Sequence, residues 1–308
     1  MERKIVHVVG TGTVGEPLIG MLCDYENKLG IDEVTFHKNS ALKKDRSKVF
    51  DLIERGARLA VDDGKEHEFK KIGMDPDLEK EEAIKRASVI IDCTPKGVGR
   101  GNKLDYYEKF SDDVKGFLAQ GSEEGFGKKY ARGINDVALN SKDQFIQIVS
   151  CNTHNMACIT KTLALDDNPD NLIEGNYVCI RRANDISQPE NFIPSPQVGN
   201  HPNEKYGTHH AADAADLFST LGMDLNLFSS AMKVNSQYMH IMRFNLKLKE
   251  STSLNEIKDK LYDNDHIAMT TKDLTSTVFS FSRDHGHYGR IMNQTVVVEQ
   301  SLHVRNDH

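Results

Sequence analysis

The chain has 308 residues, a formal net charge of −7 at neutral pH and a hydrophobic content of 38%. A chain of this length usually forms about two domains, and this apolar content is enough for buried cores. The acidic balance argues against a nucleic-acid partner. The sequence holds no apolar run near the roughly 18 residues that a membrane span requires. We therefore expect a globular protein that binds neither nucleic acid nor membranes.

The five cysteines are an odd number, are spread widely and include no Cys-x-x-Cys pair. This usage is typical of a reducing cytoplasm and argues against a disulfide framework or a zinc site. We expect four buried or incidental thiols and one reactive thiol.

The first 150 residues alternate between strand-like and helix-like segments. Apolar runs predict strands over residues 4–9, 33–37, 87–94, 116–120 and 145–150. Apolar side chains along one face predict a helix over residues 14–28. The run at 87–94 is typical of a parallel strand covered on both faces. This alternation predicts an α/β domain over residues 1–150, with a doubly wound parallel sheet of the Rossmann type.

Residues 151–308 predict a second, α+β domain with a mostly antiparallel sheet. Strands are predicted over residues 177–181, 225–228, 239–248, 266–270 and 294–298. Helices are predicted over residues 156–165, 211–221, 253–262 and 276–284. Ser253 and Glu256 have the spacing of a capping box. Residues 184–210, rich in Asn, Pro, Gly and His, predict a long loop, and such loops are usually functional.

Residues 10–15 read Gly-Thr-Gly-Thr-Val-Gly, a complete Gly-x-Gly-x-x-Gly motif between a predicted strand and a predicted helix. Gly10 would allow a tight turn, Gly12 a close approach of the backbone to a pyrophosphate, and Gly15 close packing of helix on strand. The helix start offers N–H groups to phosphate oxygens. The alternative is a glycine-rich turn without a ligand, but the context favours dinucleotide binding.

The residues after the second strand indicate which dinucleotide is bound. An acid there would hold the ribose hydroxyl of NAD, but this strand runs into His37 and Lys38 with no acid. Lys43, Lys44 and Arg46 follow, and cations suit the 2′-phosphate of NADP. We expect NADP as the preferred cofactor, with NAD as the second choice. The alternative is a solvated basic loop.

Cys151 lies between a predicted apolar strand and a helical stretch, in the sequence Ser150-Cys-Asn-Thr153. A cysteine at the start of a helix is close to the positive end of the helix dipole, which favours the nucleophilic thiolate. The alternative is a small residue chosen for packing at a domain junction.

Several histidines and arginines are candidates for a general base and for anion binding. His209 and His210 end the long polar loop, and His240 lies between apolar neighbours on a predicted strand, where a histidine can also be a core residue. Arg181 and Arg182 end a strand and could hold a phosphate, or form a surface ion pair. No metal site is predicted, because the paired histidines lack matching ligands.

These motifs resemble, over nearly the whole chain, the archaeal type of phosphorylating glyceraldehyde-3-phosphate dehydrogenase. The most specific match is Ile148-Val-Ser-Cys-Asn-Thr153, placed after Ile91-Asp-Cys-Thr-Pro-Lys-Gly-Val-Gly99 and Asn102. The other matching segments are Val9–Gly15, Gln120-Gly121, Ile180-Arg-Arg-Ala183, Ile193-Pro-Ser-Pro196, Thr208-His-His210 and Met239-His240.

The resemblance implies residue roles. Cys151 would be the nucleophile and His240 the general base. The implied dinucleotide contacts are Gly10, Gly12, Thr13, Val14, Gly15, Lys38, Gly121 and Arg182. The polar residues around the substrate and its phosphate would be Ser150, Asn152, Thr153, Arg181, His209 and His210.

The resemblance also implies a reaction and an assembly. Glyceraldehyde 3-phosphate and inorganic phosphate would be converted to 1,3-bisphosphoglycerate, and back, through a thioester on Cys151, with NADP or NAD as cofactor. Residues 151–308 would form the catalytic and oligomerisation domain of a cytoplasmic homotetramer.

The chain departs from the family pattern at three places. His154 stands where the family usually has Thr, and Met242 stands where it usually has a second His after His240. Family chains also continue past the position of His308 into a helix that brings a residue to the nicotinamide. The first departure could perturb the phosphate site or act on the thiol, and the second leaves no substitute base in that segment.

Two alternatives remain open at this point. A semialdehyde or CoA-acylating dehydrogenase would share the fold and the thioester but use another substrate. A non-catalytic NADP-binding sensor would use Cys151 as a redox switch. The Cys-Asn-Thr sequence and the His-His pair favour the sugar phosphate.

Overall fold

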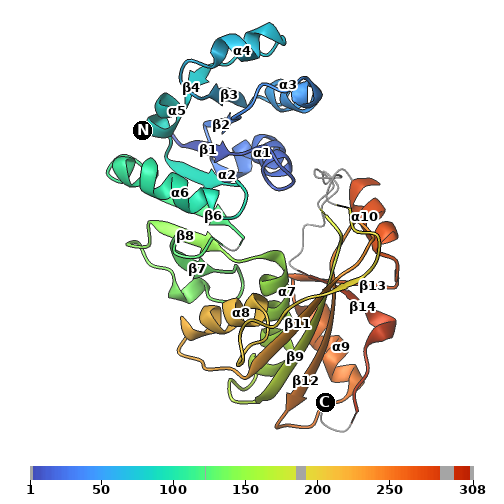
Figure 1. The fold of residues 1–308 in the computed structure, drawn as a ribbon. Helices are drawn as coiled ribbons and strands as arrows, with labels where there is room; N and C mark the ends of the chain where they lie inside the picture. Colours follow the sequence, from blue (N-terminus) through green and yellow to red (C-terminus); the bar gives the residue numbers. More distant parts are fainter. Residues whose placement is uncertain (1–2, 122, 185–191, 285–294, 306–308) are drawn as a thin grey trace. The chain divides into compact units, whose positions relative to one another are not determined.

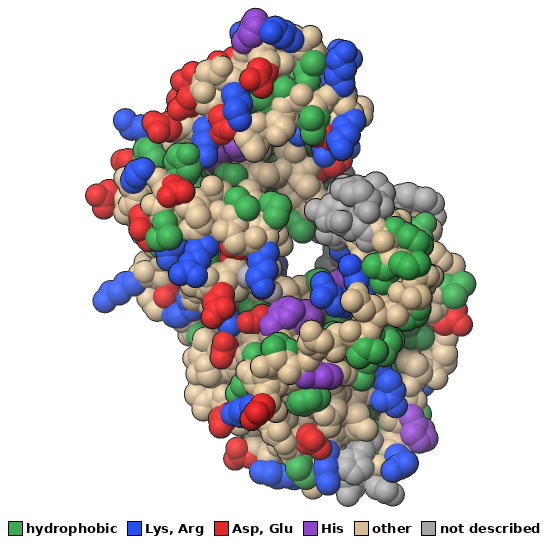
Figure 2. All heavy atoms as spheres, in the orientation of Figure 1, with side chains coloured by type: hydrophobic (Ala, Val, Ile, Leu, Met, Phe, Trp, Pro, Cys, Tyr) green, Lys and Arg blue, Asp and Glu red, His purple; other side chains and the backbone are tan. Residues whose placement is uncertain are grey.

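The computed structural model describes residues 3–121, 123–184, 192–284 and 295–305. The chain forms two compact units. The first unit comprises Met1–Lys129 and Asn140–Ile148, and the second comprises Tyr130–Leu139 and Val149–His308. Among the described residues, no helix has the length and apolar character needed to cross a bilayer. Figure 2 shows acidic and basic side chains interspersed on the visible face of both units.

The first unit is built on an eight-stranded sheet with the order β4-β3-β2-β1-β5-β6-β8-β7 (Figure 1). Its strands are β1 Ile5–Val9, β2 Glu33–His37, β3 Arg58–Val61, β4 Leu78–Glu79, β5 Val89–Asp92, β6 Gly116–Gln120, β7 Lys128–Tyr130 and β8 Phe145–Ile148. The pairs from β4 to β8 are parallel. The predicted Rossmann-type sheet is confirmed, and the strand order reverses between β1 and β5, where such sheets bind ligands at their carboxyl ends.

Helices connect these strands. They are α1 Gly15–Asp24, α2 Glu26–Leu29, α3 Arg46–Glu54, α4 Glu66–Lys71, α5 Lys80–Arg86 and α6 Val98–Asp105, with short 3-10 turns η1 Lys43–Asp45 and η2 Tyr107–Phe110. The helix predicted over residues 14–28 is interrupted at Tyr25, whose backbone leaves the helical region. The side chains of Val8, Phe36 and Leu59 from the central strands are fully buried in the core.

The second unit contains a four-stranded sheet with the order β10-β11-β9-β12. Its strands are β9 Leu172–Arg181, β10 Gln197–Val198, β11 Leu227–Lys233 and β12 Ile241–Leu248. Two of its three pairs are antiparallel and β11–β9 is parallel, so the predicted mostly antiparallel sheet is confirmed. Strands β13 Ile267–Thr270 and β14 Thr295–Val298 form a separate parallel pair. Gln294, the first residue of the last predicted strand, lies outside the described residues.

The helices of the second unit are α7 Cys151–Thr160, α8 His209–Ser219, α9 Leu254–Asp263 and α10 Thr275–Asp284, with a π-helical turn η4 Lys161–Leu165 and 3-10 turns η3 Asp136–Ala138 and η6 Glu299–Ser301. Helices α7, α8 and α10 begin one to five residues earlier than the sequence predicted, and α9 begins one residue later. Helix α9 has the predicted capping box. Helices α7 and α8 pack on each other and on the sheet, and Met156, Tyr177 and Phe218 fill the core between them (Figure 1).

The long loop predicted over residues 184–210 is shorter than expected. Strand β10 lies within it, and helix α8 begins at His209 rather than at residue 211. Residues 185–191 of this segment lie outside the described residues. Both paired histidines therefore belong to a helix start and not to a loop end.

Candidate functional site

The glycine loop of the first unit lies at the carboxyl end of β1. The Gly10 N–H donates to the carbonyl oxygen of His37 over 3.2 Å, and Gly10 has a φ of +97°. A Cβ atom on Gly15 would lie 1.9 Å from the Gly10 oxygen, whereas a Cβ atom on Gly12 would meet nothing within 4 Å. Packing therefore requires a glycine at 15, and the backbone at Gly12 borders open space.

This arrangement fits a dinucleotide. Open space beside Gly12, at the start of a ten-residue helix, is what a pyrophosphate needs in order to approach the backbone. Thr13 and Val14 belong to the same loop, and the side chain of Val14 is exposed. Gly121 follows β6 with a φ of +81°, and its N–H donates to the Ile148 oxygen over 2.9 Å.

Three charged side chains lie beside the glycine loop. Lys38 is buried and its Nζ donates to Asp45 Oδ2 over 2.6 Å. Lys48 Nζ donates to the Thr11 carbonyl oxygen over 3.0 Å and lies 3.4 Å from Asp45 Oδ1. Partial burial raises the pKa of Asp45, but the hydrogen bond and charge of Lys38, together with Lys48, lower it on balance. Asp45 and Lys48, which no sequence motif indicated, lie on the connection to α3 and on α3 itself.

The motif after β5 has a structural explanation. Asp92, 2% exposed at the end of β5, accepts hydrogen bonds from the Thr94 backbone and hydroxyl, from Asn102 Nδ2 and from Tyr107 Oη. Buried Glu123 accepts from the backbone N–H groups of Gly97 and Arg100 at the start of α6. These bonds fix the turn between β5 and α6 beside Gly10, whose Cβ position is 3.1 Å from the Cys93 oxygen.

Cys151 is the first residue of α7 in the second unit, with Ser150 as its N-cap. Ser150 Oγ accepts from the Thr153 N–H over 3.3 Å and lies 2.9 Å from Thr153 Oγ1. These bonds fix the helix start, so the Cys151 side chain is at the positive end of the helix dipole. Asn152 and Thr153 are buried, and Cys151 is exposed.

Cys151 differs from the other four cysteines, which are all buried. Burial raises the pKa of Cys23 and Cys158 to about 11, and that of Cys93 and Cys179 to about 12. Four thiols are buried as expected and Cys151 is exposed, while the reactivity expected of one thiol stays a prediction.

Basic side chains gather around the carboxyl end of β9. Arg181 is the last residue of β9, and the charges of Arg181 and Cys151 both act on the buried Cys179 thiol, so these groups lie near one another. Burial, and then the charges of His209, Arg181 and His240, lower the pKa of His210 from 6.5 to about 3. Within the second unit, Arg181, His209 and His240 therefore act on His210, and Arg181 and Cys151 act on Cys179.

His210 has unusual surroundings. It is 3% exposed, its ring centroid is 3.9 Å from that of His209, and neither ring nitrogen has a hydrogen-bond partner within the described chain. Ser229 of β11 fixes the start of α8, because its Oγ accepts from the Ala211 N–H over 3.1 Å. A buried imidazole without partners costs free energy unless a ligand satisfies it. His210 is therefore a candidate ligand-binding side chain.

His240 immediately precedes β12, so the prediction that it lies on a strand is wrong. Its Nδ1 accepts a hydrogen bond from the Arg182 backbone N–H over 3.1 Å. In a neutral ring that accepts at Nδ1, the proton is on Nε2. Arg182 thus orients His240 through its backbone, a role that its side-chain chemistry did not predict.

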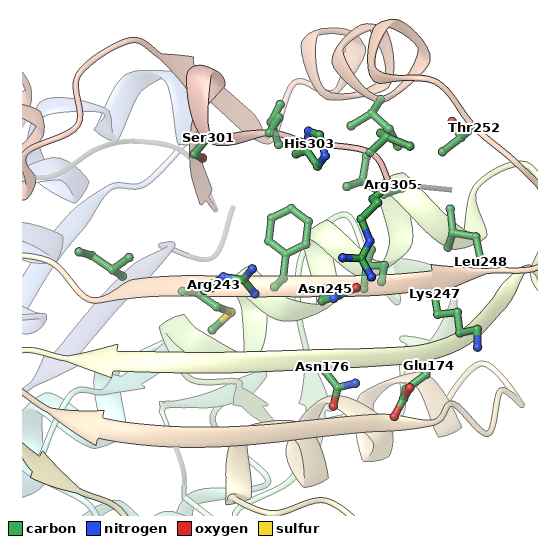
Figure 3. A pocket seen from close by; sticks show the side chains of 18 residues that line it. Glu174, Asn176, Arg243, Asn245, Lys247, Leu248, Thr252, Ser301, His303 and Arg305 are labelled. Atoms are coloured by element: carbon green, nitrogen blue, oxygen red, sulfur yellow. The ribbon is translucent and has the colours of Figure 1, made fainter. Parts of the chain in front are cut away.

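His154 and Met242, the two residues that depart from the family pattern, also have defined surroundings. His154 Nε2 lies 3.1 Å from the Arg132 carbonyl oxygen, one turn along α7 from Cys151. Met242 packs against the core of the second unit and lines a cavity of about 790 Å³ between β12 and residues 301–305 (Figure 3). Among the residues that the structure describes, those that line this cavity include none of the candidate catalytic, cofactor-binding or substrate-binding residues. Within the described residues, no group of three or more His, Cys, Asp or Glu side chains could hold a metal.

No protein-family model matches the chain. The chain is 28% identical over 269 residues to a glyceraldehyde-3-phosphate dehydrogenase of Methanobacterium bryantii, which covers 80% of this chain and 74% of the relative. It is 28% identical over 293 residues to glyceraldehyde-3-phosphate dehydrogenase 2 of Methanosarcina acetivorans, and this alignment covers 92% of this chain and 80% of the relative. The chain is 25% identical over 309 residues to a glyceraldehyde-3-phosphate dehydrogenase of Methanococcoides burtonii, and this alignment covers 98% of this chain and 85% of the relative. The predicted resemblance to archaeal glyceraldehyde-3-phosphate dehydrogenases is confirmed.

Proposed function

We propose that this protein is an NAD(P)-dependent dehydrogenase that oxidises and phosphorylates glyceraldehyde 3-phosphate to 1,3-bisphosphoglycerate, and catalyses the reverse reaction. The observation that supports this most directly is the exposed Cys151 at the start of α7, in the same compact unit as Arg181, His209, His210 and His240. The similarity to proteins named glyceraldehyde-3-phosphate dehydrogenase supports the same chemistry.

Cys151 carries the covalent step in this proposal. Its thiolate sulfur adds to the aldehyde carbon, and backbone N–H groups at the start of α7 stabilise the oxyanion, each worth about 3 kcal/mol in related sites. A bound nicotinamide ring supplies the acceptor for the hydride that leaves this carbon. The sulfur then holds the acyl group as a thioester, and inorganic phosphate attacks the carbonyl carbon and releases the thiolate and the acyl phosphate.

Arg181, His209 and His210 suit the binding of phosphate groups. Arg181 has a permanent charge and a forked set of donors, and His210 offers a buried ring that has no partner in the described chain. The reaction has to hold two anions, the phosphate of the substrate and the attacking phosphate. Ser150, Asn152 and Thr153 would complete the substrate site around Cys151.

His240 has two possible roles, and the hydrogen bond at its Nδ1 separates them. A general base must accept a proton, and the Nδ1 atom of this ring already accepts the Arg182 N–H, so the ring would have to release that hydrogen bond. If the ring instead donates its Nε2–H to the oxyanion, it keeps the bond to Arg182. If His240 is the base, His240→Gln and His240→Ala should lower turnover equally, by about 10²–10⁴-fold. If it is a donor, the glutamine variant should keep part of the activity and the pH profile of kcat. Measuring kcat against pH for both variants decides between the roles.

The proposed reaction is tested by following nicotinamide reduction with glyceraldehyde 3-phosphate, with and without inorganic phosphate. We expect turnover that depends on phosphate. Turnover without phosphate would show that water or another acceptor takes the thioester. Turnover only with a carboxylate-bearing semialdehyde, or only with CoA, would support the alternative dehydrogenases, and dinucleotide binding without any turnover would support the redox sensor.

The remaining predictions follow from the resemblance. We propose NADP or NAD as cofactor, a homotetramer as the assembly, and the cytoplasm as the location.

A further inference from the structure

The ion pairs beside the glycine loop carry an inference about cofactor selection, which rests on the proposed dehydrogenase function. Lys38, directly after β2, is 6% exposed and is bonded to Asp45. Asp45 is also close to Lys48, which donates to the carbonyl oxygen of Thr11. A Lys–Asp–Lys chain therefore runs from the carboxyl end of β2 to the glycine loop.

This chain of charges lies where Rossmann-type domains distinguish the two nicotinamide dinucleotides. At the end of the second strand an acid accepts a hydrogen bond from the ribose 2′-hydroxyl of NAD, and a cation accommodates the 2′-phosphate of NADP. The bond between the Gly10 N–H and the His37 oxygen keeps this strand end beside the glycine loop. Here the acid and the cation are both present, and they are bonded to each other.

The charges in this group balance. Lys38 and Lys48 face Asp45, and Lys48 is also 3.8 Å from Glu16. A phosphate monoester carries about −1.5 to −2 charges at neutral pH, so a 2′-phosphate has to compete with Asp45 for both lysines. Because Lys38 and Asp45 are only 7% and 16% exposed at their side chains, solvent screens this competition weakly. A 2′-hydroxyl has no charge and can donate to the same carboxylate.

We infer that Asp45 is a specificity-determining residue of the dinucleotide site: its carboxylate holds Lys38 and keeps the affinity for NADP from greatly exceeding that for NAD. The protein is thus suited to use both dinucleotides. The basic residues after β2 point to NADP when the sequence is read alone. They overstate the preference for NADP over NAD, because Lys38 is already paired with Asp45.

The test measures binding of NADP, NAD and the fragment 2′,5′-ADP by calorimetry, without turnover. In Asp45→Asn, Lys38 is released to the phosphate, so the affinities for NADP and 2′,5′-ADP should rise about tenfold while NAD binding changes less than about threefold. Asp45→Ser should behave in the same way. Asp45 is the N-cap residue of α3, but its side chain makes no capping hydrogen bond, so neither variant removes a cap from the helix.

Two controls isolate the effect. Asp51→Asn removes the same charge from an exposed position of α3, where Asp51 pairs with Arg55, and should leave the NADP to NAD ratio unchanged. Adding Lys38→Gln to Asp45→Asn should cancel the gain in NADP affinity. The inference is overturned if both Asp45 variants bind NAD but keep the wild-type ratio. If the wild-type chain binds neither dinucleotide, the proposed function is overturned, and the inference with it.

Discussion

Replacing Cys151 by alanine should lower turnover by about four orders of magnitude or more, because no thioester can form without the sulfur. The same variant should bind NADP and NAD as tightly as the wild-type chain, since the glycine loop belongs to the other compact unit. Steady-state turnover and calorimetric dinucleotide titration of the same preparation measure both effects. The fold should be unaffected, because the Cys151 side chain is exposed and alanine is a good helix former.

Cys179→Ala is the matched control for this experiment. Cys179 lies near Cys151 but is buried, and its pKa of about 12 keeps it as a thiol. Its replacement leaves a small cavity and should lower stability modestly while turnover stays within about tenfold of the wild-type rate. Full turnover in Cys151→Ala, or equal loss in the two variants, would contradict the assignment of Cys151 as nucleophile.

The second large effect is expected at Gly15. In Gly15→Ala the new Cβ would lie 1.9 Å from the Gly10 oxygen, an overlap with backbone that forces the helix α1 away from its loop. We expect the free energy of unfolding of the first unit to fall by about 3 kcal/mol, together with loss of dinucleotide binding. Urea titration followed by circular dichroism measures the first effect.

Gly12→Ala provides the contrast. Its Cβ would meet nothing within 4 Å, so the stability should change by less than about 1 kcal/mol. Dinucleotide binding should nevertheless weaken by about tenfold or more, because the methyl group enters the space that a pyrophosphate would occupy. Unchanged NADP binding in Gly12→Ala would place the dinucleotide elsewhere, and equal stability loss in both variants would contradict the packing argument.

The sequence predicted the strands that are long and apolar. Residues 33–37 and 116–120 match β2 and β6 residue for residue. The sequence missed β3, β4, β7 and β10, which contain four, two, three and two residues. The last three are too short for an apolar period to be visible. Helix α7 was predicted from residue 156, because the polar residues between Cys151 and Met156 conceal a start that the Ser150 cap fixes.

The candidate site was predictable as a set of residue types but not as a network. The sequence selected Cys151, Arg181, His209, His210 and His240, and the structure places all five in the second unit, with the His209 and His210 ring centroids 3.9 Å apart. It could not show that Arg182 acts on His240 through its backbone, because a main-chain donor leaves no trace in residue identity. Nor could it show that Asp45 neutralises Lys38, since an ion pair depends on where the turn before α3 directs the carboxylate.

The path of the chain between the two units also limits how the protein can be divided. Residues Tyr130–Leu139 belong to the second unit although they precede the last strand of the first. They supply Ala131, Ile134 and the fully buried Asn135, whose Nδ2 donates to Thr220 Oγ1 over 3.0 Å. A gene fragment that starts at residue 150 would therefore express a second unit with a hole in its core. Separate production of the two halves would require the segment 130–139 to be grafted back onto the fragment through a new linker.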